Sequence, residues 1–455
     1  MLKQIKLLFK GKQYAIGNLV GLNNITLKVV DKQVPGCNFY SPWAFEDDVI
    51  IITKITNYME FLQIHYYSMI HNTVFFRNVP SNFLVQKVTK ASSKALWAKF
   101  EAWQFRNMDL AHDFMIGTDP EIFVQDKDNA IIPAFNFLGS KQEPSKTPPY
   151  RRTQEINNVY WDGFQAEFET QATKCLAYQV DHIQIGLKGV LEHARKHNPD
   201  AKLSIKTVMD ISPQLLASAS DEHVAFGCMP SLNVYGMKGM DVSGREAPFR
   251  PAGGHLHFGI GKITESQAAP IVKALDAILG VACVSFFARF DDRRRRLLYG
   301  LAGEYRLPPH GLEYRVLSNA WLCHPLITHL IFEIARKTVV LSQKGLFTKH
   351  WVHDEKETIQ CINTCDVDKA KEILKRNEEM FKVLAFRAYP SFGDKAGSII
   401  FNAFMNGIES IIINPADLEN NWVLSPTQTW ITHSNGTNKY FNSAVKLLEK
   451  NEKVS

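Results

Sequence analysis

Glu313 and Arg315 stand two residues apart in the strand-forming run Gly311-Leu-Glu-Tyr-Arg-Val-Leu-Ser318. Side chains two apart in a strand point to the same face, so an acid and a base project together. Arg306 lies just upstream, and four arginines follow one another from Arg293 to Arg296. Fixed positive charge beside carboxylates suits a site that handles phosphate and metal together.

Three further segments present carboxylate or imidazole groups from expected strands, and in two of them the groups are again two residues apart. Like carboxylates held close together repel each other, and a bound Mg²⁺ or Mn²⁺ relieves that repulsion. Metal, carboxylates and arginines together indicate phosphoryl transfer, in which catalysis is mostly positioning and charge neutralisation. The groups are Glu121, the pair Glu167 and Glu169, and the pair His255 and His257.

Each part also has an ordinary explanation. A single glutamate on a strand is more often solvated than a ligand, and a histidine is often a hydrogen-bonded core residue. The run Arg293 to Arg296 fits the solvated end of a helix as well as a phosphate contact, and Asp162 can simply order the turn at Gly163. The combination is therefore more specific than any one motif.

The elements that must position these groups indicate an antiparallel-rich α+β domain. Strands are expected at Phe114–Val124, broken by Pro120, at Val159–Thr170 and at Leu203–Ile211. Long amphipathic or apolar stretches predict helices at 176–197, 264–287 and 324–342.

The two ends of the chain have a different character. Residues 1–110 predict an α+β accessory region with strands at 24–30 and 48–55, a helix at 92–108 and no catalytic constellation. Residues 111–345 carry all the motifs, and residues 346–455 predict a mainly helical extension packed on that domain. Helices are expected there at 366–386, 399–413 and 439–450.

Composition excludes some classes of protein. The 455 residues are 45% hydrophobic and 22% charged, which is an ordinary globular balance. A net charge of +6 fits anionic ligands but is too weak to indicate nucleic acid. Seven cysteines without a regular framework favour reduced thiols, and Cys361 and Cys365 lack a second pair at zinc spacing. No signal peptide or membrane span is apparent, so we expect a soluble, cytoplasmic protein without a membrane or nucleic-acid partner.

The ordered motifs resemble those of the phage-type carboxylate–amine (COOH–NH2) ligases, type 2. Their order also resembles that of the gamma-glutamylcysteine ligases, and the resemblance covers roughly residues 112–345. It implies an amidoligase whose glutamine synthetase-like domain has a curved, mainly antiparallel sheet backed by helices. The motifs are Gly117-Thr-Asp-Pro-Glu121, Asp162-Gly-Phe-Gln-Ala-Glu167-Phe-Glu-Thr170, Gly253-Gly-His-Leu-His-Phe-Gly259, Tyr299-Gly-Leu-Ala-Gly-Glu-Tyr-Arg306 and the Gly311–Ser318 run.

The resemblance also implies roles for single residues. ATP and Mg²⁺ (or Mn²⁺) would be the cofactors, and the reaction would pass through an acyl phosphate that an amine converts to an amide. The implied metal ligands are Glu121, Glu167, Glu169, His255 and Glu313. The implied catalytic residues are Glu313, Arg306 and Arg315, and the implied cofactor-binding residues are Arg296, Arg306, Arg315 and His257.

Two other classes stay open. The His-x-His motif fits a metal enzyme that uses no nucleotide, such as a cupin-like oxygenase. The large unassigned ends fit a non-catalytic phage interaction protein that kept the fold. The sequence does not choose among small-molecule or peptide carboxylates and amines as substrates, and it leaves open whether the protein is a homo-oligomer.

Overall fold

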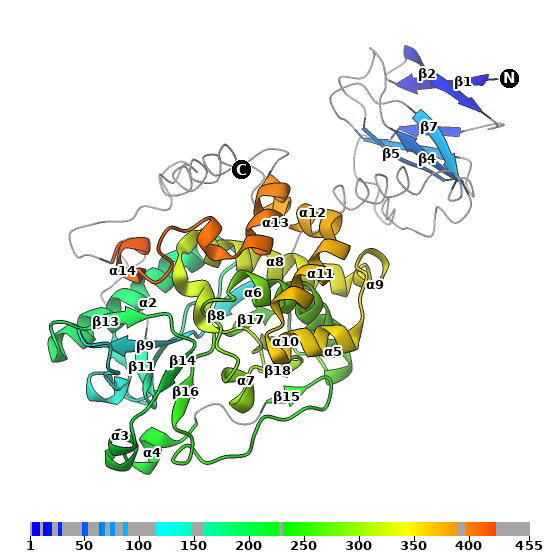
Figure 1. The fold of residues 1–455 in the computed structure, drawn as a ribbon. Helices are drawn as coiled ribbons and strands as arrows, with labels where there is room; N and C mark the ends of the chain where they lie inside the picture. The colour runs from blue at the N-terminus through cyan, green and yellow to red at the C-terminus, as the bar shows by residue number, and fades with distance from the viewer. Residues whose placement is uncertain are drawn as a thin grey trace. The chain divides into compact units, whose positions relative to one another are not determined.

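The computed structural model describes residues 114–147, 158–226, 231–388 and 396–424, together with seven strands before residue 90. The chain divides into two compact units, Met1–Asp109 and Leu110–Ser455 (Figure 1). Strands of the first unit confirm the expectations at 24–30 and 48–55, whereas the expected helix at 92–108 lies outside the described residues. The strands are β1 (Leu2–Phe9), β2 (Lys12–Val20), β3 (Thr26–Val29), β4 (Asp48–Ile52), β5 (Gln63–Ser68), β6 (Thr73–Arg77) and β7 (Val85–Thr89).

The second unit contains two five-stranded sheets in which every pair of neighbouring strands is antiparallel. The first sheet has the order β10 (Ser145–Lys146), β11 (Asn158–Asp162), β12 (Gln165–Phe168), β9 (Glu121–Gln125) and β13 (Lys202–Ser204). The second has the order β15 (Leu232–Asn233), β18 (Glu304–Arg306), β19 (Leu312–Tyr314), β17 (Leu256–Gly259) and β8 (Met115–Thr118). With the helices described below, these sheets confirm the α+β class.

The chain passes from one sheet to the other at Asp119 and Pro120, between β8 and β9. Proline has no backbone N–H to give to a ladder, so the strand is interrupted at this position, as expected. Backbone hydrogen bonds join the sheets on both sides of the break, from Thr170 N to Thr118 O at 3.0 Å and from Glu121 N to Gly253 O at 2.9 Å. The break therefore places Asp119 at the junction of the two sheets.

Three helices cover the sheets much as the sequence predicts. They are α2 (Leu176–His197), α8 (Pro325–Gln343) and a continuous helix made of α5 (Glu265–Leu275), a π-helical turn (Asp276–Gly280) and α6 (Val281–Phe286). Thr264 starts α5 with a capping box, because its side chain accepts from Gln267 N while the Gln267 side chain accepts from Thr264 N. Helix α8 packs between α5 and α2.

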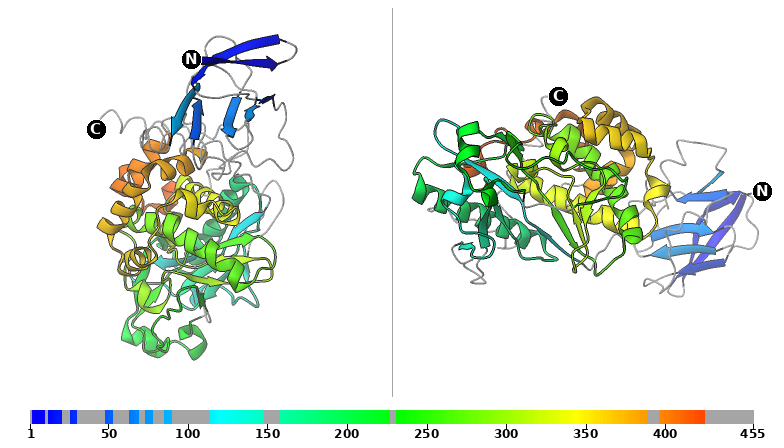
Figure 2. Two further views of the ribbon diagram at one scale, coloured as in Figure 1. Left: turned by 90° about the vertical axis from the view of Figure 1, so that its right-hand side faces the viewer. Right: turned by 90° about the horizontal axis from the view of Figure 1, so that it is seen from below.

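Among the described residues, one helix is long and apolar enough to cross a membrane, Glu265–Phe286. Of its apolar window, 83% is buried inside the protein, as in a core helix. The yellow and orange helices that follow α8 gather beside this helix (Figure 2).

Two expected strands turn out to be pairs of shorter strands. Val159–Thr170 is the hairpin β11–β12, because Gly163 has a φ of +59° and reverses the chain directly after Asp162. Leu203–Ile211 splits into β13 and β14 (Val208–Asp210), and β14 pairs with β16 (Phe249–Pro251).

The helices after residue 345 belong to the same compact unit as the sheets, and the three-part domain division stays a prediction. The expected helix at 366–386 is two helices, α11 and α12, that meet at Asn377, and the expected helix at 439–450 lies outside the described residues. The remaining helices are α3 (Pro213–Ser218), α4 (Asp221–Val224), α7 (Arg295–Leu298), α9 (Phe347–His350), α10 (Glu355–Thr364), α11 (Val367–Arg376), α12 (Glu378–Ala388), α13 (Ala396–Asn406) and α14 (Leu418–Asn421).

Arg295 ties the segment after β19 to the rest of the unit. Its guanidinium is fully buried and donates to the carbonyls of Val316 at 2.7 Å, Leu317 at 2.7 Å and Arg315 at 3.2 Å. It also donates to Ala252 O at 3.2 Å, beside Gly253. A single side chain thus satisfies four backbone acceptors and joins two of the motif segments.

We expect Arg295→Met to destabilise the protein by about 3 kcal/mol or more, because it removes four hydrogen bonds that a fully buried guanidinium makes to backbone carbonyls. Urea denaturation followed by circular dichroism measures this loss. Arg293→Met is the matched control, since Arg293 is exposed and should tolerate the change within about 0.5 kcal/mol. Equal stability of the two variants would contradict the structural role of Arg295.

Candidate functional site

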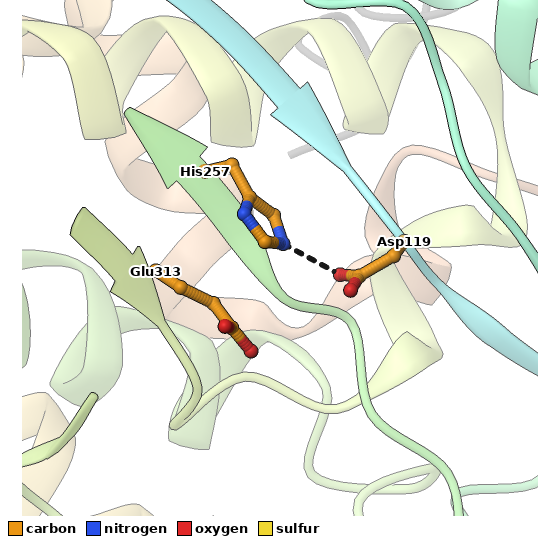
Figure 3. Close-up of side chains that lie close together, drawn as sticks. All are labelled: Asp119, His257 and Glu313. Carbon is orange, nitrogen blue, oxygen red and sulfur yellow. Dashed lines mark hydrogen bonds and ion pairs between the residues drawn. The ribbon is translucent and has the colours of Figure 1, made fainter. Parts of the chain in front are cut away.

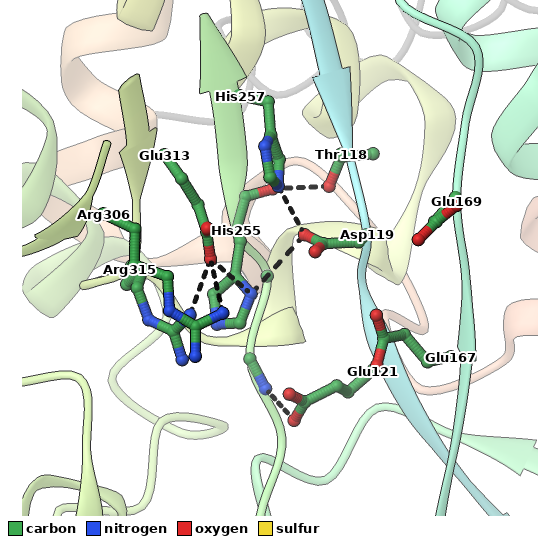
Figure 4. Close-up of polar contacts among 12 residues, drawn as sticks. Thr118, Asp119, Glu121, Glu167, Glu169, His255, His257, Arg306, Glu313 and Arg315 are labelled. Atoms are coloured by element: carbon green, nitrogen blue, oxygen red, sulfur yellow. Dashed lines mark hydrogen bonds and ion pairs between the residues drawn. The ribbon is translucent and has the colours of Figure 1, made fainter. Parts of the chain in front are cut away.

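A cavity of about 260 Å³ lies where the chain crosses between the sheets. Both sheets contribute to it, and most of its lining residues are polar or charged. The charged and hydroxyl-bearing residues that line it are Asp119, Lys141, Tyr160, Asp162, Glu167, Glu222, His255 and Arg306. Figure 4 shows the side chains around this junction.

Glu313 and Arg315 form the pair that the strand alternation predicts. Arg315 Nη1 donates to Glu313 Oε1 at 2.7 Å, and the Arg315 side chain is fully buried. Arg306 lies directly opposite Glu313 on the neighbouring strand β18, with Nη1 3.9 Å from the same oxygen. His255 Nδ1 is 3.6 Å from it as well. One carboxylate oxygen therefore faces two permanent cations and an imidazole.

Asp119 joins both histidines of the His-x-His motif. His257 Nε2 lies 2.9 Å from Asp119 Oδ1, and His255 Nδ1 lies 3.4 Å from the same oxygen. On the other side of its ring, His257 Nδ1 is 3.1 Å from His310 Nε2. Single ligand atoms of Asp119, His257 and Glu313 all lie within 4.8 Å of one another, as in a metal site (Figure 3).

Asp119 and His257 shift each other's pKa. Burial opposes ionisation of Asp119, but the two histidines outweigh it and hold the pKa of this carboxyl well below its usual range. Burial also lowers the pKa of His257, and the attraction of Asp119 and Glu313 reverses that effect, so the pKa is raised. The trio thus favours an ionised aspartate beside a histidine that readily carries a proton.

Glu121 is held against the glycine segment that precedes β17. Its Oε2 accepts from Gly253 N at 2.7 Å and from the Tyr299 hydroxyl at 2.8 Å. Neither glycine of this segment has room for a side chain. A Cβ on Gly253 would lie 2.5 Å from the Tyr299 hydroxyl, and one on Gly254 would lie 2.2 Å from Trp321 Nε1. The two glycines therefore let the backbone approach the carboxylate closely.

Glu167 lies directly opposite Glu121 in the register of β12 and β9. The Tyr160 hydroxyl bridges Glu167 Oε1 at 2.7 Å and Glu169 Oε1 at 3.0 Å. Burial, together with the nearby charges of Asp119 and Asp162, raises the pKa of Glu167 well above its usual range. Glu167 and Glu169 thus lie on one face, as the alternation predicts, with the Tyr160 hydroxyl between them.

The arginine run serves the fold, which corrects the expected cofactor contact of Arg296. Its guanidinium is buried, pairs with Asp291 Oδ2 at 2.9 Å and donates to Val316 O at 2.9 Å and Ile362 O at 3.3 Å. Arg294 pairs with Asp292 and Asp210 on the surface. Because these donors are committed to protein acceptors, Arg296 is not a phosphate contact, and neither it nor Arg295 forms a solvated helix end.

The structure does not gather the five expected metal ligands into one compact group. Among the described residues only the trio of Asp119, His257 and Glu313 has three ligand atoms close together, and it shares only Glu313 with the expected set. His255 contacts Asp119 and Glu313 of this trio, while Glu121 on β9 and Glu167 on β12 lie to one side of it (Figure 4). Asp119 was the missed residue, although it sits inside the Gly117–Glu121 motif.

The residues present fit a divalent cation. The trio combines two carboxylates with one imidazole, a donor set that suits Mn²⁺ as well as Mg²⁺. The neighbouring positions on β9 and β12 offer carboxylate oxygen alone. His255 Nε2 is buried and has no hydrogen-bond partner in the described part of the chain, so this nitrogen is available to an ion or ligand.

An α+β unit with such a charged junction is a candidate metal-dependent enzyme. The family model described as phage phiEco32-like COOH.NH2 ligase-type 2 matches residues 240–424. This match confirms the resemblance to the type 2 carboxylate–amine ligases for the part of the chain that carries the last three motifs.

The other comparisons are weaker. A crystal structure of a bifunctional glutathione synthetase from Pasteurella multocida is similar at 12% identity and a TM-score of 0.30. The alignment covers 77% of this chain and 54% of that enzyme, so the chain spans about half of its length. A likeness this weak does not define the fold. No curated protein sequence matches the chain.

We expect Asp162→Asn to stabilise the metal-free protein more at pH 8 than at pH 5. Burial, reinforced by the charge of Glu121, raises the pKa of Asp162 to about 7. A free aspartate has a pKa of about 3.9, so the folded protein holds this proton more tightly than the unfolded chain does. The stability that this group contributes is therefore lost as the pH rises from about 4 through about 7.

Asparagine carries no charge, so the variant should escape this loss. Melting temperatures of both proteins with EDTA, between pH 5 and pH 8, measure the difference. An equal shift at both ends of this range would show that the Asp162 carboxyl is not perturbed.

Proposed function

We propose that the chain is an ATP- and divalent-cation-dependent carboxylate–amine ligase with a glutamine synthetase-like catalytic domain. One observation carries the proposal: five separate segments bring carboxylates, imidazoles and two arginines to one junction between antiparallel sheets. The family match over residues 240–424 supports the amide-forming class. The substrates would be a carboxylate and an amine, from small molecules or peptides.

The size of the cavity is consistent with this chemistry. At about 260 Å³ it is smaller than the pockets of about 300–1,000 Å³ that hold whole drug-sized ligands. It suits the reacting phosphate and its counter-ions, while the remainder of a nucleotide would lie outside it. The chain has no Walker-type loop, so the phosphates would be bound by side chains at the sheet.

The proposed reaction has two steps. A substrate carboxylate oxygen attacks the γ-phosphorus of ATP, the bond to the bridging oxygen breaks, and ADP leaves an acyl phosphate behind. An amine nitrogen then attacks the acyl carbon, loses a proton and displaces inorganic phosphate, which leaves an amide. A bound divalent cation would neutralise the phosphate oxygens during transfer.

The residues of this chain have separate roles in the proposal. Asp119, His257 and Glu313 would hold one cation, with His255 beside them, and Glu121, Glu167 and Glu169 would offer oxygens to another. Arg306 is partly exposed in the cavity wall and would bind the acyl phosphate or the substrate carboxylate. Arg315 is buried behind Glu313, so it would orient that carboxylate and add positive charge next to the transferred group.

We expect Glu313→Gln to lower the rate of ADP formation by about 100-fold or more. The change removes the negative charge at the oxygen that Arg315, Arg306 and His255 surround, and such preorganised groups are typically worth that much. ADP release with Mn²⁺ or Mg²⁺, ATP and a panel of amino acids and peptides measures it. Glu355→Gln is the control, because Glu355 is an exposed partner of Lys273 away from the cavity. ADP release that needs no divalent cation would rule out the proposal.

A metal enzyme without nucleotide is the second candidate. The specific observation is that His255 and His257 both lie next to Asp119, so two imidazoles and a carboxylate stand together. Iron or zinc retained through purification, with no binding of an ATP analogue, would favour this function over the ligase.

A further inference from the structure

Lys141 lines the cavity from a short loop whose backbone is held by hydrogen bonds. The Gly139 amide donates to Ser145 Oγ at 3.0 Å, and Trp161 N on β11 donates to Gly139 O at 3.0 Å. A Cβ on Gly139 would lie 2.1 Å from Glu143 O, so the loop closes on itself at this glycine. The position of Lys141 is therefore set by the loop backbone and its attachment to the sheet.

The ammonium of Lys141 faces the two carboxylates of the first sheet. Its Nζ is 3.1 Å from Glu169 Oε1 and 3.7 Å from Glu167 Oε1. The same ammonium lies 4.9 Å from the centre of the Tyr160 ring, whose hydroxyl is within hydrogen-bond distance of both carboxylates. Three side chains thus converge on one cation at the rim of the cavity.

A divalent cation that binds Glu167 and Glu169 competes with the ammonium for the negative charge of these two carboxylates. The ammonium lies against Oε1 of each carboxylate, and two cations held this close together repel each other. The lysine can yield, because its side chain is 59% exposed and a pair of this kind contributes little to stability. Its four-carbon stem lets the ammonium move by several ångströms while the loop stays in place.

We propose that Lys141 is a built-in counter-ion that a divalent cation displaces from Glu167 and Glu169, and that the displaced ammonium then binds phosphate oxygens in the cavity. Lys141 and Arg306 line the same cavity, so the released charge stays next to the arginine that faces the reacting group. Lysine is a mobile point charge suited to a phosphate that changes position during a reaction. The second half of this inference rests on the proposed ligase function, and the first half does not.

The first experiment measures Mn²⁺ binding alone, by electron paramagnetic resonance at pH 8 and low salt, on the full chain. We expect Lys141→Met to bind Mn²⁺ about tenfold more tightly than the wild type, because the competing charge is gone. Lys141→Arg should bind like the wild type, since it keeps a cation there. The matched control is Lys146→Met, a lysine on β10 that contacts Asn158 and does not line the cavity. Unchanged or weaker Mn²⁺ binding by Lys141→Met would overturn the counter-ion role.

The second experiment measures binding of a non-hydrolysable ATP analogue by calorimetry with saturating Mn²⁺. We expect Lys141→Met to bind it about tenfold more weakly, and Lys146→Met to match the wild type. Equal affinities of wild type and Lys141→Met would overturn the phosphate role alone. A wild type that binds Mn²⁺ but no analogue would overturn the ligase proposal and the phosphate role with it, while the Mn²⁺ comparison still decides the counter-ion role.

Discussion

Neutralisation of crowded carboxylates is the constraint on which this site depends. Glu313 sits in the middle of a sheet, and its charge is tolerated because Arg315 donates to it from a fully buried position. Arg315 is in turn fixed by Arg295, which donates to its carbonyl and to those of the next two residues. Removing one partner of such a buried pair costs far more than the pair itself contributes. The contacts from Arg295 to the Arg315 carbonyl and from Arg315 to Glu313 therefore stabilise both the fold and the site.

Close approach of backbones is the second requirement, and two small features of the sequence meet it. Pro120 interrupts the ladder so that Asp119 stands between the sheets, and the glycines at 253 and 254 let a strand pass against Glu121 and Trp321. Asp119 can then reach His257 on β17 and His255 directly before that strand, while Glu121, two residues later, faces β12. A continuous strand would hold both acids on one face of a single sheet.

The sequence predicts the parts of this structure that depend on local pattern. Alternation places Glu313 beside Arg315 and Glu167 beside Glu169, and amphipathic spacing places α2 at its observed bounds. It fails where the outcome depends on contacts between distant segments. The pattern of the four arginines fits a solvent-facing helix end and a phosphate contact equally well. The sequence around them does not show that Arg295 and Arg296 donate to the carbonyls of Leu317 and Val316 in the folded chain. The sequence did not predict Asp119 as a site residue for the same reason, since His257, its hydrogen-bond partner, lies more than 130 residues away along the chain.

The balance of charge around the cavity indicates why a cation fits there. Carboxylates gather at the junction, and Lys141, Arg306 and Arg315 are permanent cations that lie close to them. Burial and neighbouring charge raise the pKa values of Asp162 and Glu167, and the carboxylates of Asp119 and Glu313 raise the pKa of His257. A divalent ion that binds here would displace protons and the Lys141 ammonium from the carboxylates. The backbone of the two sheets would not have to move. These carboxylates are Asp119, Glu121, Asp162, Glu167, Glu169, Glu222 and Glu313.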